Sequence, residues 1–255
     1  TVDHLQRELD NYRPLNQTEI KRLMSDFIID YTYNTNAIEG NAITLRETAL
    51  IINENMTISG KPLTDHLDII NLKEAFYYVL ELTHKRMLTE SDILNIHNIV
   101  LRSNPEGRGR YRNIPVRIAG SVHTPPQPYE IRPRIEQLLF SYQEKLTQCH
   151  ILESVSWFHL EFETIHPFVD GNGRTGRLLL NLELIKNGYM PINIKFADKN
   201  KYYDCFDDYR TSGKSDMLTG VVLEYEINEL KQYLEILKTA NVDKKINSEE
   251  IELEQ

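Results

Sequence analysis

Two stretches of helical periodicity on either side of a glycine-rich turn constrain the fold of this chain more than any other feature. Apolar side chains from Val155 to Ile165 recur at i, i+3, i+7 and i+10, which is the spacing of one helix face. Helical spacing resumes from Leu178 to Ile185, beyond the Gly-Asn-Gly turn at residues 171–173. The pattern predicts two helices with marked core-facing sides, joined by a tight turn.

Helical periodicity dominates the rest of the chain as well. It marks segments at about 64–83, 93–100 and 219–238, with breakers between them such as the Asn-Pro-Glu-Gly run at 104–107. The segment at about 113–124 is different, because its β-branched residues and central glycine favour a short two-stranded hairpin. We therefore predict one all-α domain, a helical bundle with a single short β-hairpin.

Composition argues against several classes of function. The chain has 29 Lys and Arg against 38 Asp and Glu, a net charge of -9, so nucleic acid is a poor candidate for a partner. No apolar run approaches the roughly 20 residues that cross a bilayer, and the polar N-terminus is unlike a signal peptide. We therefore expect a cytoplasmic protein with no membrane partner. The two cysteines, Cys149 and Cys205, lack the spacing of a metal site or a disulfide framework.

Residues 166–177 contain the groups that carry chemistry. The turn glycines permit positive φ and direct N–H groups toward one point, and the helix N-terminus behind them adds unpaired N–H groups and the positive end of its dipole. Together they form an anion nest suited to a phosphate chain. Arg174 and Arg177 share a helix face and can hold further phosphate oxygens. Asp170 offers a hard oxygen ligand for Mg²⁺, and His166, expected on the rim, can take a proton from an alcohol.

Each part of this segment also has an ordinary structural interpretation. A Gly-Asn-Gly turn is common in loops, a single histidine is usually structural, and two arginines at a helix start oppose the dipole unless an anion offsets them. The complete combination is far more specific than its parts and favours a nucleotide site. No G-x-x-x-x-G-K-[ST] P-loop is present, and the H-E-x-x-H order of zinc proteases is absent, which leaves His159 as a core residue.

The segment from His166 to Arg177 resembles the signature of the Fic family, H-x-F-x-D/E-G-N-G-R-x-x-R, with every defining position matched. The resemblance implies a Fic catalytic core over residues 89–212. An N-terminal helical extension would precede it over 1–88, and a C-terminal helix with a charged, solvent-facing tail would follow over 213–255. It also implies ATP as substrate, Mg²⁺, and transfer of AMP to a Ser, Thr or Tyr hydroxyl of target proteins and of the chain itself.

The resemblance assigns roles within the loop. His166 would be the general base, Phe168 would anchor the loop in the core, and Asp170 would hold Mg²⁺. Arg174 would bind the phosphate tail and Arg177 would reach the γ-phosphate. The predicted ATP-binding residues of the loop are Asp170, Gly171, Asn172, Gly173, Arg174, Thr175, Gly176 and Arg177.

The predicted hairpin resembles the flap of the family, a strand-like edge on which a target segment docks through main-chain hydrogen bonds. The expected flap positions beside the nucleotide are Val116, Arg117, Ile118 and Ala119. Tyr202 and Tyr203 resemble the aromatic pair on the adenine side of the family's site. From the residues alone, an exposed hairpin without function and two ordinary tyrosines stay equally open.

A second segment, near the N-terminus, resembles the inhibitory motif of the family, [S/T]-x-x-x-E-[G/N]. Thr35, Glu39 and Gly40 match it, in a short helix expected at about 33–41 with Thr35 as its cap. A carboxylate paired with Arg177 would occupy the guanidinium intended for the γ-phosphate. Without the family, the segment is a short capped helix with a solvated glutamate.

Three functions stay open from the sequence. The first is an AMP transferase inhibited by Glu39. The second keeps the fold but removes AMP or transfers phosphate, UMP or phosphocholine; phosphate-transferring relatives typically carry Lys where this chain has Gly173. The third is a non-catalytic nucleotide-sensing module, disfavoured because His166 and Asp170 are both intact. The expected partners are a target protein on the flap and, by family habit, a second copy of the chain.

Overall fold

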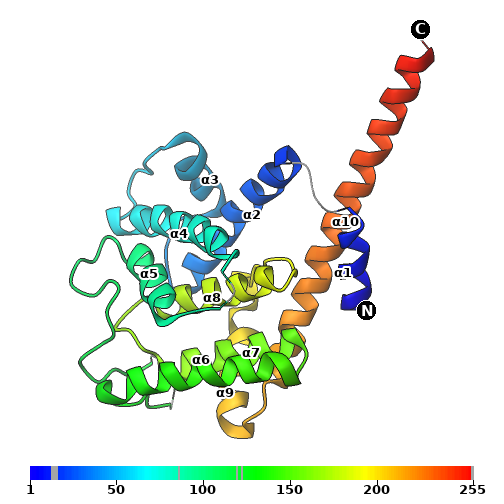
Figure 1. Ribbon diagram of the computed structural model, residues 1–255. Helices are drawn as coiled ribbons and strands as arrows, with labels where there is room; N and C mark the ends of the chain where they lie inside the picture. The colour runs from blue at the N-terminus through cyan, green and yellow to red at the C-terminus, as the bar shows by residue number, and fades with distance from the viewer. Residues whose placement is uncertain (13–16, 86, 119, 122, 254–255) are drawn as a thin grey trace.

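The regular secondary structure is entirely helical in the part of the chain that the computed structural model describes, residues 1–12, 17–85, 87–118, 120–121 and 123–253. The helices are α1 (Val2–Asp10), α2 (Gln17–Ile38), α3 (Leu45–Glu54), α4 (Leu63–Leu82), α5 (Glu90–Val100), α6 (Ile131–Gln148), α7 (Ile151–Ile165), α8 (Asn172–Lys186), α9 (Lys199–Ser212) and α10 (Asp216–Leu253), with short 3₁₀ turns η1 (Pro128–Glu130) and η2 (Phe196–Asp198). The prediction of an all-α fold is confirmed, and Figure 1 shows the arrangement.

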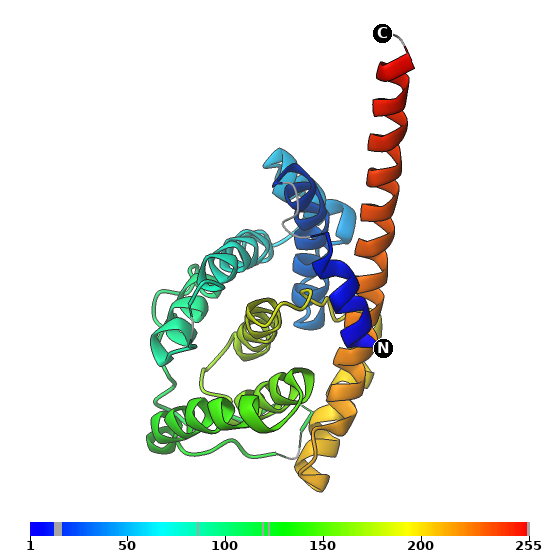
Figure 2. The same ribbon diagram turned by 45° about the vertical axis from the view of Figure 1, so that its right-hand side comes forward.

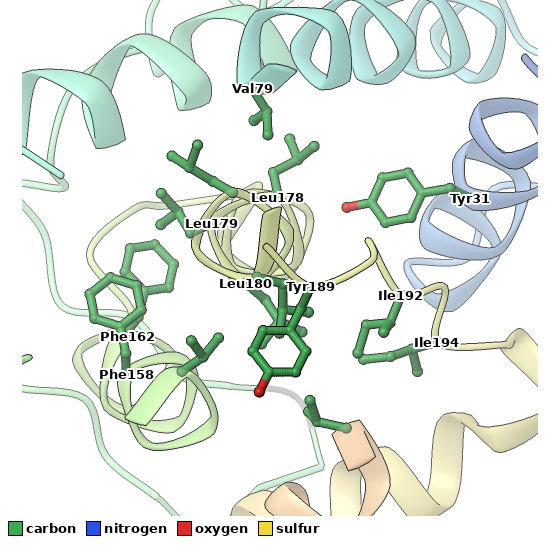
Figure 3. Packing of buried hydrophobic residues seen from close by; sticks show 14 of the residues in the cluster. Tyr31, Val79, Phe158, Phe162, Leu178, Leu179, Leu180, Tyr189, Ile192 and Ile194 are labelled. Atoms are coloured by element: carbon green, nitrogen blue, oxygen red, sulfur yellow. The ribbon is translucent and has the colours of Figure 1, made fainter. Parts of the chain in front are cut away.

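Helix α8 lies at the centre of the molecule. Its consecutive leucines Leu178, Leu179 and Leu180 are all buried, and Figure 3 shows them directed to different sides of the helix, toward α4, α7 and the Tyr189 region. A helix that is buried on every side must be enclosed by others, and α8 contacts α7, α4, α5 and α2. The two helices predicted on either side of the turn are therefore confirmed. The turn leads into a helix that neighbouring helices enclose.

One hydrophobic core runs through all three predicted segments of the chain. It includes Leu9 of α1, Val79 of α4, Phe158 of α7 and Leu234 of α10, and α1 lies alongside α10 in both views (Figures 1 and 2). The division at residues 88 and 212 stays a prediction. Among the described residues, no helix has the length and apolar character needed to span a membrane.

The last helix is longer than predicted. We expected it to end at about residue 238, with a charged tail from Asn241 that is frayed or solvent-facing, whereas α10 continues to Leu253. The sequence from 239 to 253 contains neither glycine nor proline, so nothing in it stops a helix.

The predicted β-hairpin is not observed. No residue of 113–124 that the structure describes belongs to a strand, and Ala119 lies outside the described residues. Pro115 has no N–H to donate to a ladder. The carbonyls of Ile114 and Pro126 accept hydrogen bonds from the guanidinium of Arg112 instead of from a neighbouring strand. The segment is irregular, with one turn closed by the Ser121 N–H and the Ile118 carbonyl at 3.2 Å.

The predicted short helix at 33–41 is the end of a long one. α2 has 22 residues with no glycine or proline between Gln17 and Ile38, so Thr35 lies inside the helix and is not its cap. The helix ends just before Glu39, and Gly40 follows with φ of 96°, a conformation that glycine adopts at little cost. Glu39 is therefore held at the C-terminal end of a rigid element.

Candidate active site

The active-site loop begins where α7 ends. His166 is the C-cap residue of α7 and adopts the left-handed conformation, with φ of 48° and its N–H bonded to the Phe162 carbonyl. Phe168 then enters the core with no exposed surface. The Asn172 side chain accepts from the Phe168 N–H and donates to the Phe168 carbonyl, both at 2.9 Å. The loop from His166 to α8 is thus closed by its own asparagine.

His97 of α5 braces the same loop from outside. Its ring stacks on Phe168 with centroids 3.5 Å apart and planes 5° from parallel. Because Nδ1 accepts from the Gly109 N–H at 3.0 Å, Nε2 carries the proton and donates to the Asp170 carbonyl at 3.0 Å. Burial lowers the pKa of His97 to about 4, so the imidazole is neutral at pH 7 and this hydrogen-bond pattern persists.

The N-terminus of α8 lies at the place where the sequence predicts an anion nest. Gly171 precedes it with φ of 77° as the N-cap residue. The carboxylate of Glu39 packs so closely against Gly173 that any Cβ there would clash with it. An acidic side chain thus already lies against the first turn of α8, at the positive end of the helix dipole. A side chain at position 173 would therefore displace the Glu39 carboxylate from this place.

Arg177 makes the strongest contact with this acid. Its Nη2 donates to Glu39 Oε1 at 2.6 Å and to the Thr35 carbonyl at 3.1 Å, while the guanidinium is 2% exposed. Burial alone would lower the pKa of Arg177, but the Glu39 carboxylate and the neighbouring phenols of Tyr202 and Tyr31 raise it above its ordinary value. The arginine is charged at every accessible pH. The sequence-predicted pair of Glu39 and Arg177 is brought together as expected.

Tyr202 supports Arg177 from the far side. The guanidinium carbon lies 5.9 Å from the centre of the Tyr202 ring. The phenol donates to His159 Nε2 at 2.7 Å, and His159 Nδ1 donates to the Gly176 carbonyl at 3.0 Å. Burial lowers the pKa of His159 to about 3, so it is a neutral link between α9 and α8. His159 is therefore a core residue, as predicted, and it holds the Arg177 environment together.

The second loop arginine has two carboxylate partners. Arg174 is 5% exposed, and its Nη1 lies 2.9 Å from Asp68 of α4 while its Nη2 lies 3.2 Å from both oxygens of Asp170. Asp170 also accepts from the Gly171 N–H and keeps a largely exposed side chain. We predicted Arg174 on the phosphate tail, and its two terminal nitrogens are both paired with acids.

His166 faces an unusual acid across one helical turn. Its Nδ1 is buried without a hydrogen bond of good geometry, and the carboxylate of Glu163 lies 3.8 Å away. Burial, followed by smaller effects that include the Arg112 charge, lowers the pKa of His166 to about 4. Burial raises the pKa of Glu163 to about 8. At pH 7 the imidazole is unprotonated and able to accept a proton, although it is less exposed than the rim position we expected.

These groups surround one pocket of about 180 Å³. Its lining residues are Glu39, Ile118, Gly120, Ser121, Glu163, His166, Gly173, Arg177, Tyr202, Tyr203, Phe206, Asp207 and Arg210. Of the predicted flap positions, Ile118 lines the pocket, whereas Val116 and Arg117 do not. A larger groove of about 550 Å³ runs between α2 and α10, but its charged lining is mostly acidic and its Lys195 is paired with Asp30. That groove is unsuited to a triphosphate.

Sequence reasoning missed four residues that shape the site: Asp68, His97, Arg112 and Glu163. Glu163 carried a local signal, because it lies one helical turn before His166 and therefore on the same face. The other three lie between 54 and 106 positions from their partners in the loop, and no spacing rule connects them to it.

The fold and the site together define a class: an all-helical domain with an anion nest, buried arginines and an adjacent neutral imidazole. Residues 87–184 match the model of the Fic/DOC family. A protein adenylyltransferase Fic from Nematostella vectensis is 34% identical over 197 residues, which are 75% of this chain and 45% of that protein. The chain belongs to the Fic/DOC family, and it spans less than half the length of this curated relative.

Solved structures agree with that assignment. A Fic domain-containing signaling protein from Bacteroides thetaiotaomicron superposes with a TM-score of 0.86 at 24% identity, covering 93% of this chain and 97% of its own. A fragment of Fic-1 from C. elegans superposes with a TM-score of 0.82 at 27% identity, covering 94% of this chain and 71% of its own. The first shows a shared fold, and the second shows likeness in sequence as well.

Proposed function

We propose that this protein is a protein adenylyltransferase, which transfers AMP from ATP to a hydroxyl side chain of target proteins. The observation that carries the proposal is the arrangement at the pocket: an anion nest and the buried guanidinium of Arg177 beside the neutral imidazole of His166. The name of the Nematostella vectensis relative, protein adenylyltransferase Fic, supports the same reaction.

In the proposed reaction, the target hydroxyl oxygen attacks the α-phosphorus of ATP. The bond from that phosphorus to the oxygen bridging the α- and β-phosphates breaks, and pyrophosphate leaves. His166 accepts the hydroxyl proton at Nε2, and it is unprotonated at neutral pH because burial lowers its pKa to about 4. The N–H groups at the start of α8 and the Arg177 side chain hold the phosphates in line.

Asp170 is the residue that fits a magnesium ion. It offers one exposed carboxylate beside the nest, and the described residues contain no group of three or more His, Cys, Asp or Glu side chains that would hold a metal by themselves. This donor set suits Mg²⁺, which is commonly bound by one or two carboxylates together with phosphate oxygens and water. When bound, the ion would neutralise charge on the phosphates.

We propose that Glu39 inhibits the reaction. Its carboxylate lies against the nest and 2.6 Å from the guanidinium that the γ-phosphate needs. ATP would then bind only with a displaced triphosphate and a poorly aligned α-phosphate. A misplacement of about 1 Å can lower a rate on the order of 10²-fold.

The proposed target site is the segment before α6, residues 113–118, 120–121 and 123–124. Its described residues lie in an irregular conformation and belong to no strand, and its Ile118 and Ser121 line the pocket. A target segment pairing there through main-chain hydrogen bonds would bring its hydroxyl to His166. A Ser, Thr or Tyr hydroxyl has the chemistry required.

The test compares labelling by [α-³²P]ATP in four proteins: the parent, Glu39→Gly, Glu39→Gly/His166→Ala and Glu39→Gly/His84→Ala, with His84 as a histidine outside the pocket. We expect Glu39→Gly to raise self-labelling and labelling of a cell lysate by roughly 10- to 100-fold. Removal of His166 should abolish it, and removal of His84 should leave it unchanged. Label that appears only from [γ-³²P]ATP would indicate phosphate transfer and contradict the proposal.

A further inference from the structure

Arg112 has an unusual set of partners. Its guanidinium donates to three main-chain carbonyls: from Nε to His166 at 2.9 Å, from Nη1 to Ile114 at 3.2 Å, and from Nη2 to Pro126 at 2.6 Å. Its own N–H donates to the Pro167 carbonyl at 3.0 Å. One side chain therefore joins the start of the active-site loop to both ends of the segment before α6.

The charge of Arg112 is buried without an acid. The residue is 3% exposed, and burial lowers the pKa of its guanidinium. Each of its bonds in the described part of the chain goes to a carbonyl dipole and none to a carboxylate. Burying an unpaired cation is costly. The three carbonyls offset that cost only while the guanidinium keeps its hydrogen bonds to them, so the side chain is held in one place. A planar guanidinium meets three acceptors in fixed directions, which a lysine ammonium does not reproduce.

His166 needs such an external restraint. Its φ of 48° lies in the left-handed region, which is unfavourable for a residue other than glycine. In this conformation its carbonyl turns toward Arg112 Nε, and the ring is directed to the pocket that it lines. If the carbonyl were free, the residue could relax and carry the imidazole out of register with the nest.

We propose that Arg112 is a positioning residue that fixes the imidazole of His166 relative to the segment where the target docks. The proposal rests on the proposed function, because it assigns His166 the role of base. Arg112 touches neither nucleotide nor target in this account. It acts through two main-chain connections, one to the base and one to the docking segment, and sets the distance between them.

The test uses the Glu39→Gly protein with Arg112→Lys, which keeps the charge and loses the planar fork. The matched control is Arg110→Lys, an exposed arginine two residues earlier. We expect Arg112→Lys to lower kcat for AMP transfer about 10- to 100-fold. Its Kd for ATP should stay within about twofold of the control, because the nest and Arg177 are unchanged. Equal kcat values in the two variants would overturn the proposal.

A purely structural role would instead lower the melting temperature and weaken ATP binding together with kcat. If Arg112→Lys does not fold, the kinetic test uses Arg112→Gln instead. The hydrogen-exchange rate of the Arg112 Nε–H in the unsubstituted protein then tests whether the guanidinium is held in place. That proton should exchange far more slowly than the Nε–H of Arg110, and equal rates would contradict the geometry. If the Arg110→Lys control transfers no AMP, the proposed function fails, while the exchange measurement still reports on Arg112.

Discussion

Each arginine of the active-site loop has an acid from the N-terminal helices as its partner. Arg177 pairs with Glu39 beyond α2, and Arg174 pairs with Asp68 on α4. Removing the acid from such a buried pair would leave an uncompensated charge, which costs several kcal/mol. The two acids differ in one respect: Glu39 lies in the pocket, whereas Asp68 does not line it. A triphosphate would therefore compete with Glu39 and leave Asp68 in place.

The raised pKa of Glu163 predicts that the free energy of unfolding depends on pH. Burial raises its pKa to about 8 in the folded protein, against about 4.3 in an unfolded chain. Between these values the folded state holds a proton that the unfolded state has lost, so the contribution of Glu163 to stability is full below pH 4 and declines as pH rises to 8. We expect Glu163→Gln to remove this decline, with a difference on the order of a few kcal/mol. Urea unfolding of both proteins at pH 5 and pH 8 measures it.

The matched control for that experiment is Glu161→Gln, on the same helix with its carboxylate bonded to the Tyr209 hydroxyl. It should leave the pH dependence of stability as it is in the parent. If Glu163→Gln and Glu161→Gln lose stability equally between pH 5 and pH 8, Glu163 is not the group responsible.

The sequence predicted one of the two arginine–acid pairs and missed the other. Glu39 lies in a short motif that resembles a known inhibitory segment, so its partner followed from the resemblance. Asp68 is one of several acids on α4, and only the packing of α4 against α8 selects it. Arg112 and His97 could not be found from the sequence either, because the groups to which they donate are main-chain carbonyls, which have no sequence signature.

Two acids of helix α4 are expected to contribute differently to the free energy of unfolding. Asp68 pairs with a buried arginine, whereas Glu74 pairs with Arg102 on the surface, where both side chains are about half exposed. Removing one partner of a buried pair costs about 3 kcal/mol or more, and an exposed pair contributes at most about 1 kcal/mol. Because Arg174 keeps the exposed carboxylate of Asp170 as a second partner, we expect Asp68→Ala to lower the free energy of unfolding by about 1–3 kcal/mol and Glu74→Ala by less than about 1 kcal/mol. Urea denaturation tests this, and equal losses would contradict it.

The presence of the helices was predictable from this sequence, whereas the positions of their ends and the conformation of the flap were harder to predict. Periodicity identified α7 and α8 because their apolar faces are long and regular. The β-branched residues and central glycine of 113–124 favoured a hairpin, but Pro115 has no N–H for a ladder, and Arg112 donates to the carbonyls of Ile114 and Pro126. The inhibitory motif predicts a short helix capped by Thr35, because the motif itself contains no sign of the longer helix before it. The helix actually begins 18 residues before Thr35, at Gln17.

At the scale of the whole molecule, we propose that α4 forms a contact with a second copy of the chain. Leu63, Ile70 and Tyr77 recur every seven residues and are 69%, 39% and 46% exposed. Such an apolar row on one helix face suits a symmetric dimer. We expect sedimentation to show a dimer that Ile70→Asp converts to a monomer, while Phe140→Asp, at an exposed phenylalanine of α6, leaves it intact. A parent protein that sediments as a monomer at about 100 μM would contradict the proposal.

Nucleotide binding reports directly on Glu39, which is proposed to occupy the site that the γ-phosphate needs. Calorimetry with ATP and ADP on the parent and on Glu39→Gly separates that phosphate from the rest of the nucleotide. We predict that Glu39→Gly binds ATP at least about tenfold more tightly than the parent, a gain of about 1.4 kcal/mol, with a smaller gain for ADP. Equal gains for ATP and ADP, or no binding of either by Glu39→Gly, would contradict the account.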